Sequence, residues 1–269
     1  MSPPSLRIAL RSLVASQRPL KCYLGSFADG IHLCKKVLPG EKCSCPKLSD
    51  WKGRRKNLYQ ALEEARSLNA DVVVFPELSI CAGLCQELGA WLQDNTHPFC
   101  MVVPGSFHEE PDSMGKPINR TMLLDGNGRE VFSHEKMIPM GTDKACYEVI
   151  RRGKRLHLLK TPLGLVALAI CRDFLEDDLS ISLPWQQIAP DWAIVPSMTA
   201  IQGIRAHKVR AKSLANCCGT RSLVPNQCPY GIFVENSHGF ASWPDGKGDF
   251  HEHIIDPSSC EGRLARIPI

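Results

Sequence analysis

The clearest periodic stretch of the chain is residues 54–70, in which apolar side chains return every three or four positions among charged ones. The apolar positions are Leu58, Ala61, Leu62, Ala65 and Leu68. This spacing predicts an amphipathic helix. The next residues, "DVVVFPEL" (71–78), form a β-branched run that predicts a buried strand. A helix followed by an apolar strand is typical of a parallel sheet covered by helices.

Similar patterns continue along the rest of the chain. They predict strands over 99–107, 191–198, 220–228 and 231–239, hairpins over 119–136 and 156–171, and a helix over 204–219 that ends at Gly219. Residues 1–50 mix short apolar pieces with Pro, Gly and Lys and give no periodic signal. We therefore expect an α/β fold in a single domain over 1–269, with 1–52 as an atypical N-terminal part.

Composition places the chain among ordinary globular proteins. Its 269 residues are 43% hydrophobic and 22% charged, which is enough apolar material for a sizeable core. The net charge of +4 is small, and the basic runs at 52–56 and 151–155 are short, so a nucleic-acid partner is not indicated. No apolar run approaches the roughly 20 residues of a membrane span, and we expect no membrane partner.

The cysteines indicate a reducing compartment. The chain has 13, an odd and scattered set, which is typical of reduced thiols inside a cell rather than of a disulfide framework. The N-terminal stretch lacks the uninterrupted apolar segment of a secretory signal. A transit peptide is an alternative, because the first 28 residues contain Arg and Ser but no acidic residue. We expect a cytoplasmic protein.

Four cysteines and two histidines are potential metal ligands: Cys22, Cys34, Cys43, Cys45, His251 and His253. The cysteines could hold zinc, but they lack the paired C-x2-C spacing of a structural zinc site. The two histidines would share one face of a strand, which is equally typical of exposed residues. We expect free thiols and no bound metal.

Three chemically active residues stand at or just after the ends of expected strands. Glu77 follows "DVVVFP", Lys136 closes the first hairpin in "HEK", and Cys171 ends the apolar run "LVALAI". In α/β sheets the carboxyl ends of strands border the crevice where ligands bind. Each residue alone is commonplace, but the three together meet a chemical requirement.

That requirement is nucleophilic attack by a thiol on a carbon–nitrogen centre. Cys171 must lose its proton to act, and Glu77 could accept that proton if burial raises its pKa. The intermediate carries an anion, which Lys136 and the backbone N–H of Arg172 could stabilise. The sequence therefore predicts Glu77 as base, Lys136 as oxyanion stabiliser and Cys171 as nucleophile.

The ordered segments "ADVVVFPEL", "HEKMIP" and "GLVALAICRD", with their strand context, resemble the nitrilase or carbon–nitrogen hydrolase superfamily over roughly residues 56 to 260. The resemblance implies an α-β-β-α sandwich and a Glu77–Lys136–Cys171 triad. It also implies a thioester acyl-enzyme formed from a small amide, N-carbamoyl compound or nitrile. The resemblance implies no metal or organic cofactor. It does imply that copies of the chain associate through a helical face into homo-oligomers.

Five further residues are candidates for support or substrate binding: Glu148, Arg172, Asp173, Ser197 and Thr199. The resemblance implies a second glutamate that positions the lysine, and Glu148 is the nearest candidate, although "CYEVIRRG" matches loosely. Asp173 is expected to hold the turn by accepting backbone N–H bonds. Arg172 departs from the family pattern and either points away or recognises an anionic substrate. Ser197 and Thr199 would border the same crevice.

The loops expected to surround the substrate are 106–118, 137–150, 172–190 and 197–206, which contain Arg172, Trp185, Arg205 and His207. Their side chains suggest an anionic or aromatic substrate. Three alternatives stay open: an amide-forming or acyl-transfer enzyme of the same chemistry, a non-catalytic scaffold that kept the fold, and a zinc-holding interaction protein.

Overall fold

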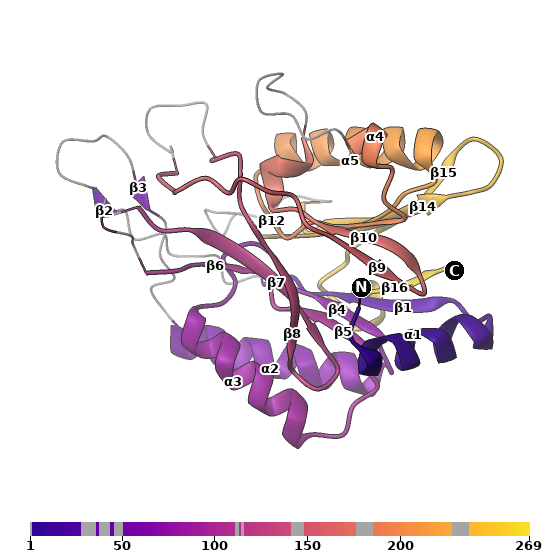
Figure 1. Ribbon diagram of the computed structural model, residues 1–269, viewed down its shortest axis with the longest axis horizontal. Coiled ribbons are helices and arrows are strands. Elements are labelled where there is room, and N and C mark those ends of the chain that lie inside the picture. The colour runs from indigo at the N-terminus through magenta and orange to yellow at the C-terminus, as the bar shows by residue number, and fades with distance from the viewer. Residues whose placement is uncertain are drawn as a thin grey trace.

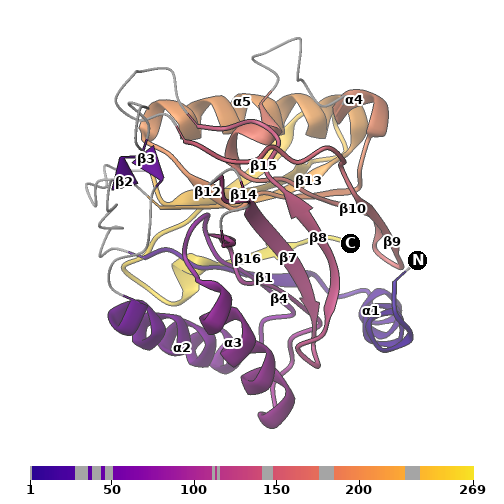
Figure 2. The same cartoon turned by 60° about the vertical axis from the view of Figure 1, so that its left-hand side comes forward.

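The computed structural model describes residues 2–27, 36–37, 44–45, 51–110, 113, 116–140, 148–175, 185–227 and 237–269. Two β-sheets face each other, and helices cover their outer sides (Figure 1). Figure 2 shows the same layers from another side, with the sheets between two groups of helices. The α-β-β-α sandwich expected from the sequence is confirmed.

The first sheet has seven strands in the order β16-β1-β4-β5-β7-β6, with β8 paired to β7. Their bounds are β1 Leu20–Leu24, β4 Val72–Val74, β5 Met101–Val103, β6 Ser106–His108, β7 Asn119–Asp125, β8 Glu130–Glu135 and β16 Leu264–Ile267. The central strands β1, β4 and β5 run parallel, with Cys22 opposite Val72 and Val72 opposite Met101. Their carboxyl ends therefore open on the same edge of the sheet.

The second sheet has the order β15-β14-β13-β11-β10-β9, with β12 paired to β13. Its strands are β9 Leu158–Thr161, β10 Gly164–Leu168, β11 Trp192–Ile194, β12 Ser197–Met198, β13 Arg221–Gln227, β14 Gly239–Pro244 and β15 Phe250–Ile254. Here β10, β11 and β13 run parallel, with Val166 opposite Trp192 and Trp192 opposite Arg221. A separate two-stranded pair joins β2 Lys36–Val37 to β3 Ser44–Cys45.

The described α-helices are α1 Pro4–Ser16, α2 Trp51–Ser67, α3 Ala82–Asp94, α4 Trp185–Ile188 and α5 Ile201–Cys218, and short 3-10 turns are η1 Cys171–Phe174 and η2 Glu261–Arg263. Helices α2 and α3 cover the first sheet, and α4 and α5 cover the second (Figure 1). The helices expected over 54–70 and 204–219 are α2 and α5, each beginning three residues earlier than expected. Gly219 ends α5 with a positive φ of 72°, as its sequence position predicted.

Alternation along the strands divides the core into layers. Val72 and Val74 of β4 face the interior between the sheets, whereas Val73 packs beneath α2 and α3. In the second sheet Ile194 faces the same interior, and its neighbour Ala193 packs beneath α5. The continuous apolar runs in the sequence follow from this arrangement, because both faces of these strands are buried.

Helix α1 was not expected, because residues 1–50 gave no periodic signal. Leu6, Leu10 and Leu13 of α1 belong to the core between the two sheets. The helix is also tied to both sheets, since Ser5 Oγ donates to Asp125 Oδ2 at 2.9 Å and the Ser2 amide donates to Lys160 O at 3.3 Å. Part of the atypical N-terminal region therefore completes the shared core.

The run 99–107 was expected to be one strand, and this is wrong: β5 and β6 are separated by Pro104 and Gly105. Gly105 has a positive φ of 89°, and a Cβ there would clash with Pro76 O and Ser79 Oγ. Glycine is required because the chain passes directly against the turn that follows β4. The run 191–198 is likewise divided into β11 and β12.

The other expectations for residues after 118 have mixed outcomes. The strand expected over 220–228 is β13, and the two hairpins over 119–136 and 156–171 are confirmed. Most of the strand expected over 231–239 lies outside the described residues. The sequence did not predict β16, whose short segment mixes polar and apolar residues without a clear period.

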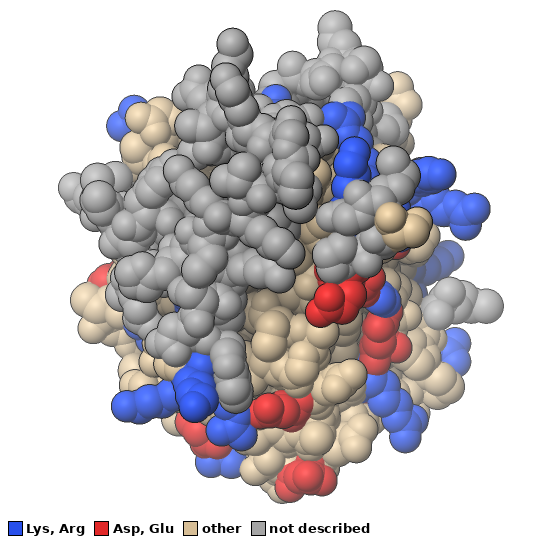
Figure 3. All heavy atoms as spheres, turned by 90° about the vertical axis from the view of Figure 1, so that its left-hand side faces the viewer, with Lys and Arg blue, Asp and Glu red and all other residues tan. Residues whose placement is uncertain are grey.

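Two arginines of the basic run at 52–56 make contacts within the protein. Arg54 is buried with its guanidinium 4.2 Å from the centre of the Phe27 ring, and Arg55 Nε donates to Glu87 Oε2 at 2.6 Å. On the face in Figure 3, Lys and Arg side chains alternate with Asp and Glu around an uncharged area. None of the described helices has the length and apolar character needed to cross a membrane.

Replacing Leu10 by Ala should lower the free energy of unfolding by about 2–5 kcal/mol, because Leu10 is fully buried between the sheets. Ile8 on the same helix is 67% exposed, so Ile8→Ala should change it by no more than about 0.5 kcal/mol. Urea denaturation of both variants measures the difference. Equal midpoints would contradict the placement of α1 in the core.

Candidate active site

Glu77 lies in the turn that follows β4. The Phe75 amide donates to Val103 O at 2.9 Å, which continues the parallel pairing past the strand. The Glu77 amide then donates to Ser197 O at 3.3 Å in the second sheet, and the Glu77 carbonyl accepts from Gln227 Nε2. The turn is thus held from both sheets, at Phe75 by the first and at Glu77 by the second, and Glu77 is fully buried.

The turn contains one unusual backbone conformation, at Leu78. Its φ is 54°, a left-handed value that residues with a side chain rarely adopt. The Leu78 amide donates to Ser106 Oγ at 3.1 Å, and Ser106 is fixed at the start of β6. This bond stabilises the turn that directs Glu77 into the site.

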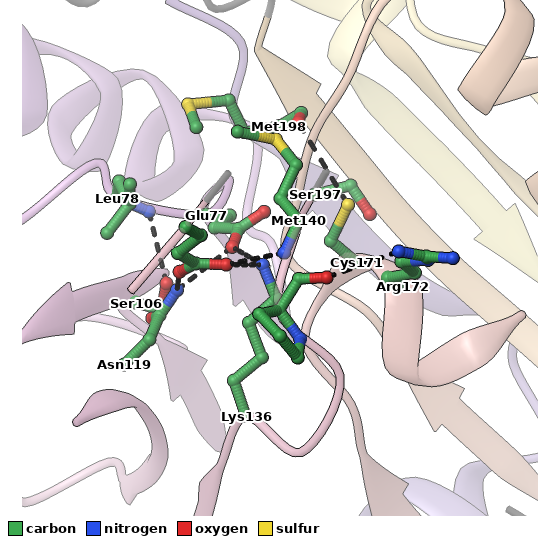
Figure 4. A network of polar contacts seen from close by, with 12 residues as sticks. Glu77, Leu78, Ser106, Asn119, Lys136, Met140, Cys171, Arg172, Ser197 and Met198 are labelled. Carbon is green, nitrogen blue, oxygen red and sulfur yellow. Dashed lines mark hydrogen bonds and ion pairs between the residues drawn. The ribbon is translucent and has the colours of Figure 1, made fainter. Parts of the chain in front are cut away.

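Lys136 follows β8 directly. Its amide donates to Asn119 O at 2.8 Å and its carbonyl accepts from the Gly153 amide at 2.9 Å. The residue is fully buried. Its Nζ lies 2.7 Å from Glu77 Oε1 and 2.6 Å from Glu148 Oε2, so one ammonium bridges two carboxylates (Figure 4).

Cys171 begins η1, in the segment that follows β10, with a positive φ of 48°. The Cys171 amide donates to Pro196 O at 2.9 Å, and its carbonyl accepts from His207 Nε2 at 3.1 Å. Its Sγ lies 3.9 Å from Met198 O. Because the strained backbone is held at both its amide and its carbonyl, the thiol is presented at a fixed position beside Glu77 and Lys136 (Figure 4).

Glu148 has a complete set of hydrogen-bond donors. Its Oε1 accepts from His108 Nε2 at 3.2 Å and Asn119 Nδ2 at 2.9 Å. Its Oε2 accepts from Lys136 Nζ at 2.6 Å and the Met140 amide at 2.9 Å. Burial alone would raise the pKa of Glu148, but Lys136 and His108 outweigh it, so the pKa lies well below its usual range. Glu148 is therefore a permanent anion at neutral pH.

Glu77 has fewer donors, and all are on one oxygen. Oε1 accepts from Lys136 Nζ and from Asn119 Nδ2 at 2.9 Å. Oε2 is buried and has no hydrogen-bond partner within the described part of the chain. Burial raises the pKa of Glu77, and Glu148 raises it further, although Lys136 and the Cys171 thiol oppose this. Of the two carboxylates, Glu77 is the one whose pKa is raised.

Burial and the two glutamates also affect the other members of the group. Burial lowers the pKa of Lys136, but Glu148 and Glu77 reverse this and hold the pKa above its usual value. Burial and Glu77 together raise the pKa of the Cys171 thiol. The resting site thus contains a protonated amine, a neutral thiol and a carboxylate that can take the thiol proton.

Asp173 connects the turn of Cys171 to the segment of Lys136. Its carboxylate is fully buried and accepts from His134 Nε2 at 2.8 Å, from the Ile138 amide at 2.7 Å and from the Met137 amide at 3.1 Å. The sequence predicted that Asp173 accepts backbone N–H groups. These groups belong to the segment after Lys136 rather than to its own turn.

The other supporting candidates lie around this centre. Arg172 Nη1 donates to Pro139 O at 3.4 Å, and Ser197 is fully buried beneath the site. The backbone of Thr199 is bracketed by the Asn226 side chain, which accepts from the Thr199 amide and donates to its carbonyl, both at 2.9 Å. Ser197 therefore joins the Glu77 turn to the second sheet, and Thr199 is held against β13 by Asn226.

Two of the residues expected to face the substrate do not. Trp185 is fully buried, packs edge-on against Phe174 and donates from Nε1 to Asp173 O at 2.8 Å. His207 is buried beneath the Cys171 carbonyl. The loop expected over 197–206 is also partly wrong, because α5 begins at Ile201.

The described residues contain no cluster of His, Cys, Asp or Glu that could hold a metal. Cys22, one of the four possible zinc ligands, lies in the core between the sheets. Cys34, Cys43 and the side chain of Cys45 lie outside the described residues. His251 and His253 are on β15, where His253 Nε2 bonds to Gly262 O at 3.0 Å.

Sequence reasoning missed three polar residues of the site: His108, Asn119 and Gln227. Asn119 donates to both glutamates, and His108 lies opposite it in the β6–β7 pair. Gln227 donates to the Glu77 carbonyl. A strand residue that is polar where its neighbours are apolar is a weak signal, and only pairing between strands shows which of them meet.

Solved structures with this fold include several enzymes. Saccharomyces cerevisiae Nit3, a member of branch 10 of the nitrilase superfamily, is 15% identical with a TM-score of 0.63, and the match covers 91% of this chain and 92% of that chain. Glutamine-dependent NAD+ synthetase from Acinetobacter baumannii is 14% identical with a TM-score of 0.61. The match covers 93% of this chain and 47% of that chain.

A third structure is a mutant amidase from Nesterenkonia sp. AN1 that carries the product of Michael addition of acrylamide at its active site cysteine. It is 14% identical with a TM-score of 0.59, and the match covers 88% of this chain and 90% of that chain. These similarities show a shared fold. A search of curated protein sequences gives no match.

The family comparison is more specific than the fold. The model described as "Carbon-nitrogen hydrolase" matches residues 43–183, which is just over half of the chain. The matched range contains Glu77, Lys136, Glu148 and Cys171. The chain therefore belongs to the carbon–nitrogen hydrolase family.

Proposed function

We propose that the protein is a thiol hydrolase that cleaves the carbon–nitrogen bond of a small amide, N-carbamoyl compound or nitrile. The observation that carries the proposal is the buried Lys136 ammonium held between Glu77 and Glu148 beside the Cys171 thiol. Such a group unites a nucleophile, a base and a fixed positive charge, which are the parts that acyl transfer to a thiol requires.

In the first half of the reaction, Glu77 Oε2 accepts the thiol proton as Cys171 Sγ attacks the substrate carbonyl carbon. The electron pair of the carbonyl moves onto oxygen, where Lys136 Nζ and the Arg172 amide stabilise it. Glu77 then returns its proton to the leaving nitrogen. The carbon–nitrogen bond breaks, ammonia or an amine departs, and a thioester on Cys171 remains.

In the second half, water takes the place of the leaving group. Glu77 accepts a proton from water as the water oxygen attacks the thioester carbon, and the acid product leaves as Cys171 regains its proton. A nitrile has no leaving group at the start: thiol attack places the anion on nitrogen, which takes the proton from Glu77 to give a thioimidate. A first water then adds and ammonia leaves to give the thioester, which a second water hydrolyses. Glu148 stays ionised throughout and holds Lys136 in place.

A reactive thiol is known in a protein with this fold, which supports the proposal. The amidase variant from Nesterenkonia sp. AN1 carries acrylamide on its active site cysteine, and we assign the equivalent role to Cys171. Amide formation and a non-catalytic scaffold share the same fold and are outcomes of the test below. A homo-oligomer and a cytoplasmic location stay predictions.

The first test is Cys171→Ala. The parent protein should give ammonia, or a mass increase on Cys171, with at least one member of a panel of small amides, ureides and nitriles. Cys171→Ala should give neither, because the nucleophile is absent. Intact-mass spectrometry and an ammonia assay measure both, with Cys260→Ala as the control for an exposed free thiol.

Each outcome of that test has a meaning. Acyl transfer to an added amine without hydrolysis would indicate the amide-forming alternative. If no compound of the panel gives ammonia or a mass increase, and iodoacetamide does not label Cys171, the proposal is contradicted. The non-catalytic scaffold is then the favoured alternative.

The pH dependence tests Glu77. Because the pKa of Glu77 is raised, the carboxylate gains its proton at a higher pH than the usual value of about 4.3 and can then no longer accept the thiol proton. The rate of Cys171 alkylation by iodoacetamide should therefore fall on acidification well before that pH. This decrease in rate at low pH is the acidic limb of the pH profile. Glu77→Gln should react slowly and should lack the acidic limb. An unchanged profile would count against Glu77 as the base.

Lys136→Met should affect both stability and turnover. Two buried carboxylates left without their cation should cost about 3–5 kcal/mol of unfolding free energy, and the lost oxyanion contact should lower kcat about 10²–10³-fold. Adding Glu148→Gln removes one of the two charges, so Lys136→Met/Glu148→Gln should regain stability but not turnover. Thermal denaturation and kcat separate the two effects; recovery of turnover would refute the electrostatic role of Lys136.

A further inference from the structure

His108 is the ionisable residue, apart from Lys136, that the described structure places on the paired carboxylates. It ends β6 and lies directly opposite Asn119 in the antiparallel pair with β7. Both side chains reach the same oxygen, since His108 Nε2 lies 3.2 Å and Asn119 Nδ2 lies 2.9 Å from Glu148 Oε1. The contact is therefore built by strand register.

The alternation of β6 separates His108 from its neighbours. Ser106 and His108 point to the site, where Ser106 Oγ supports Leu78, and Phe107 points into the outer core beneath α3. Glu109 is the next residue, and its Oε1 accepts a hydrogen bond from Arg120 Nη1 at 2.8 Å. Of the nearby carboxylates, Glu148 is the one bonded to His108.

The direction of the hydrogen bond follows from the chemistry of its partner. The ionised Glu148 carboxylate can only accept, so His108 Nε2 must carry a proton in this contact. Each donor on Glu148 stabilises its ionised form. Removing His108 would leave Glu148 with three donors rather than four, which brings it closer to Glu77, with its two donors on Oε1.

We propose that His108 is a positioning residue that keeps Glu148 ionised and thereby leaves the exchangeable proton of the carboxylate pair to Glu77. The inference rests on the proposed function, because it concerns how Glu77 is made the base. It assigns His108 no contact with substrate: His108 acts through Glu148 and Lys136.

Within the described residues, the groups around the His108–Glu148 contact are charged, neutral or bonded elsewhere, and Glu77 and the Cys171 thiol lie beyond Lys136 and Asn119. Glu148 and Lys136 bear charge, Asn119 on β7 is neutral, and Glu109 on β6 is engaged with Arg120. His108 lowers the pKa of Glu148, after the larger effects of burial and Lys136. Without His108, Glu148 would compete with Glu77 for the proton, and the pair would take up its proton at a higher pH. The state with both carboxylates ionised, in which Glu148 holds Lys136 and Glu77 can accept the thiol proton, would then be less populated under mildly acidic conditions.

The experiment measures Cys171 alkylation by iodoacetamide against pH, by mass spectrometry of the intact protein and of the Cys171 peptide. No substrate is needed. His108→Phe fills the volume without a donor and should move the acidic limb upward by about one pH unit, which is about tenfold in rate on that limb. His108→Gln, whose amide can donate, should recover at least half of the shift.

Glu109→Gln is the matched control, since it changes the adjacent residue, which is bonded to Arg120 instead. Its profile should overlay that of the parent. Thermal denaturation verifies that each variant is folded at the pH values used. A His108→Phe profile that overlays the parent, or a His108→Gln shift equal to that of His108→Phe, overturns the inference.

The Glu77→Gln profile separates this inference from the proposed function. If Glu77→Gln keeps the acidic limb of the parent, Glu77 is not the base and the proposed function fails. If Glu77→Gln loses the limb while His108→Phe leaves it unmoved, the proposed function stands and only the role of His108 is wrong.

Discussion

The structure depends on one fully buried ammonium group. Lys136 lies between Glu77 and Glu148, and each contact is shorter than 2.8 Å. A buried charge without partners costs several kcal/mol, so these residues can be buried only if all three are brought together. They come from the turn after β4, the end of β8 and the segment at 148–150. Pairing the charges therefore fixes the relative positions of three distant parts of the chain.

The distribution of donors gives the two glutamates different roles. Glu148 is saturated and stays an anion, whereas Glu77 keeps one oxygen without a partner within the described residues. Asn119 Nδ2 donates to both carboxylates and so fixes their separation. Two identical side chains thus acquire distinct chemistry from their surroundings alone.

The backbone around the site is strained and must be held by neighbours. Leu78 and Cys171 both have positive φ, at 54° and 48°. The Leu78 amide bonds to Ser106, and Cys171 is held by Pro196 and His207. Strained residues of this kind persist only where the surrounding structure determines them. Here that structure is the junction of the two sheets, since the Glu77 amide donates to Ser197 of the second sheet.

The sequence alone determined the elements whose signals are local. The period of residues 54–70 follows from burial of one helix face, and the apolar run at 72–74 follows from burial of both strand faces. It also indicated Glu77, Lys136 and Cys171, because a reactive side chain after an apolar strand falls at the sheet edge. The structure brings all three together at that edge.

Tertiary structure decided what depends on contacts between distant segments. Leu6, Leu10 and Leu13 form a helix face only because a gap between two sheets receives them. Cys22 is a core residue because β1 is covered on both faces, with Cys22 between the sheets and Tyr23 beneath the helices. His108 and Asn119 acquire meaning through strand register, which local sequence specifies weakly for polar residues. The sequence supplies the reactive groups, and the packing of the sheets decides how many donors each carboxylate receives, since those donors come from other parts of the chain.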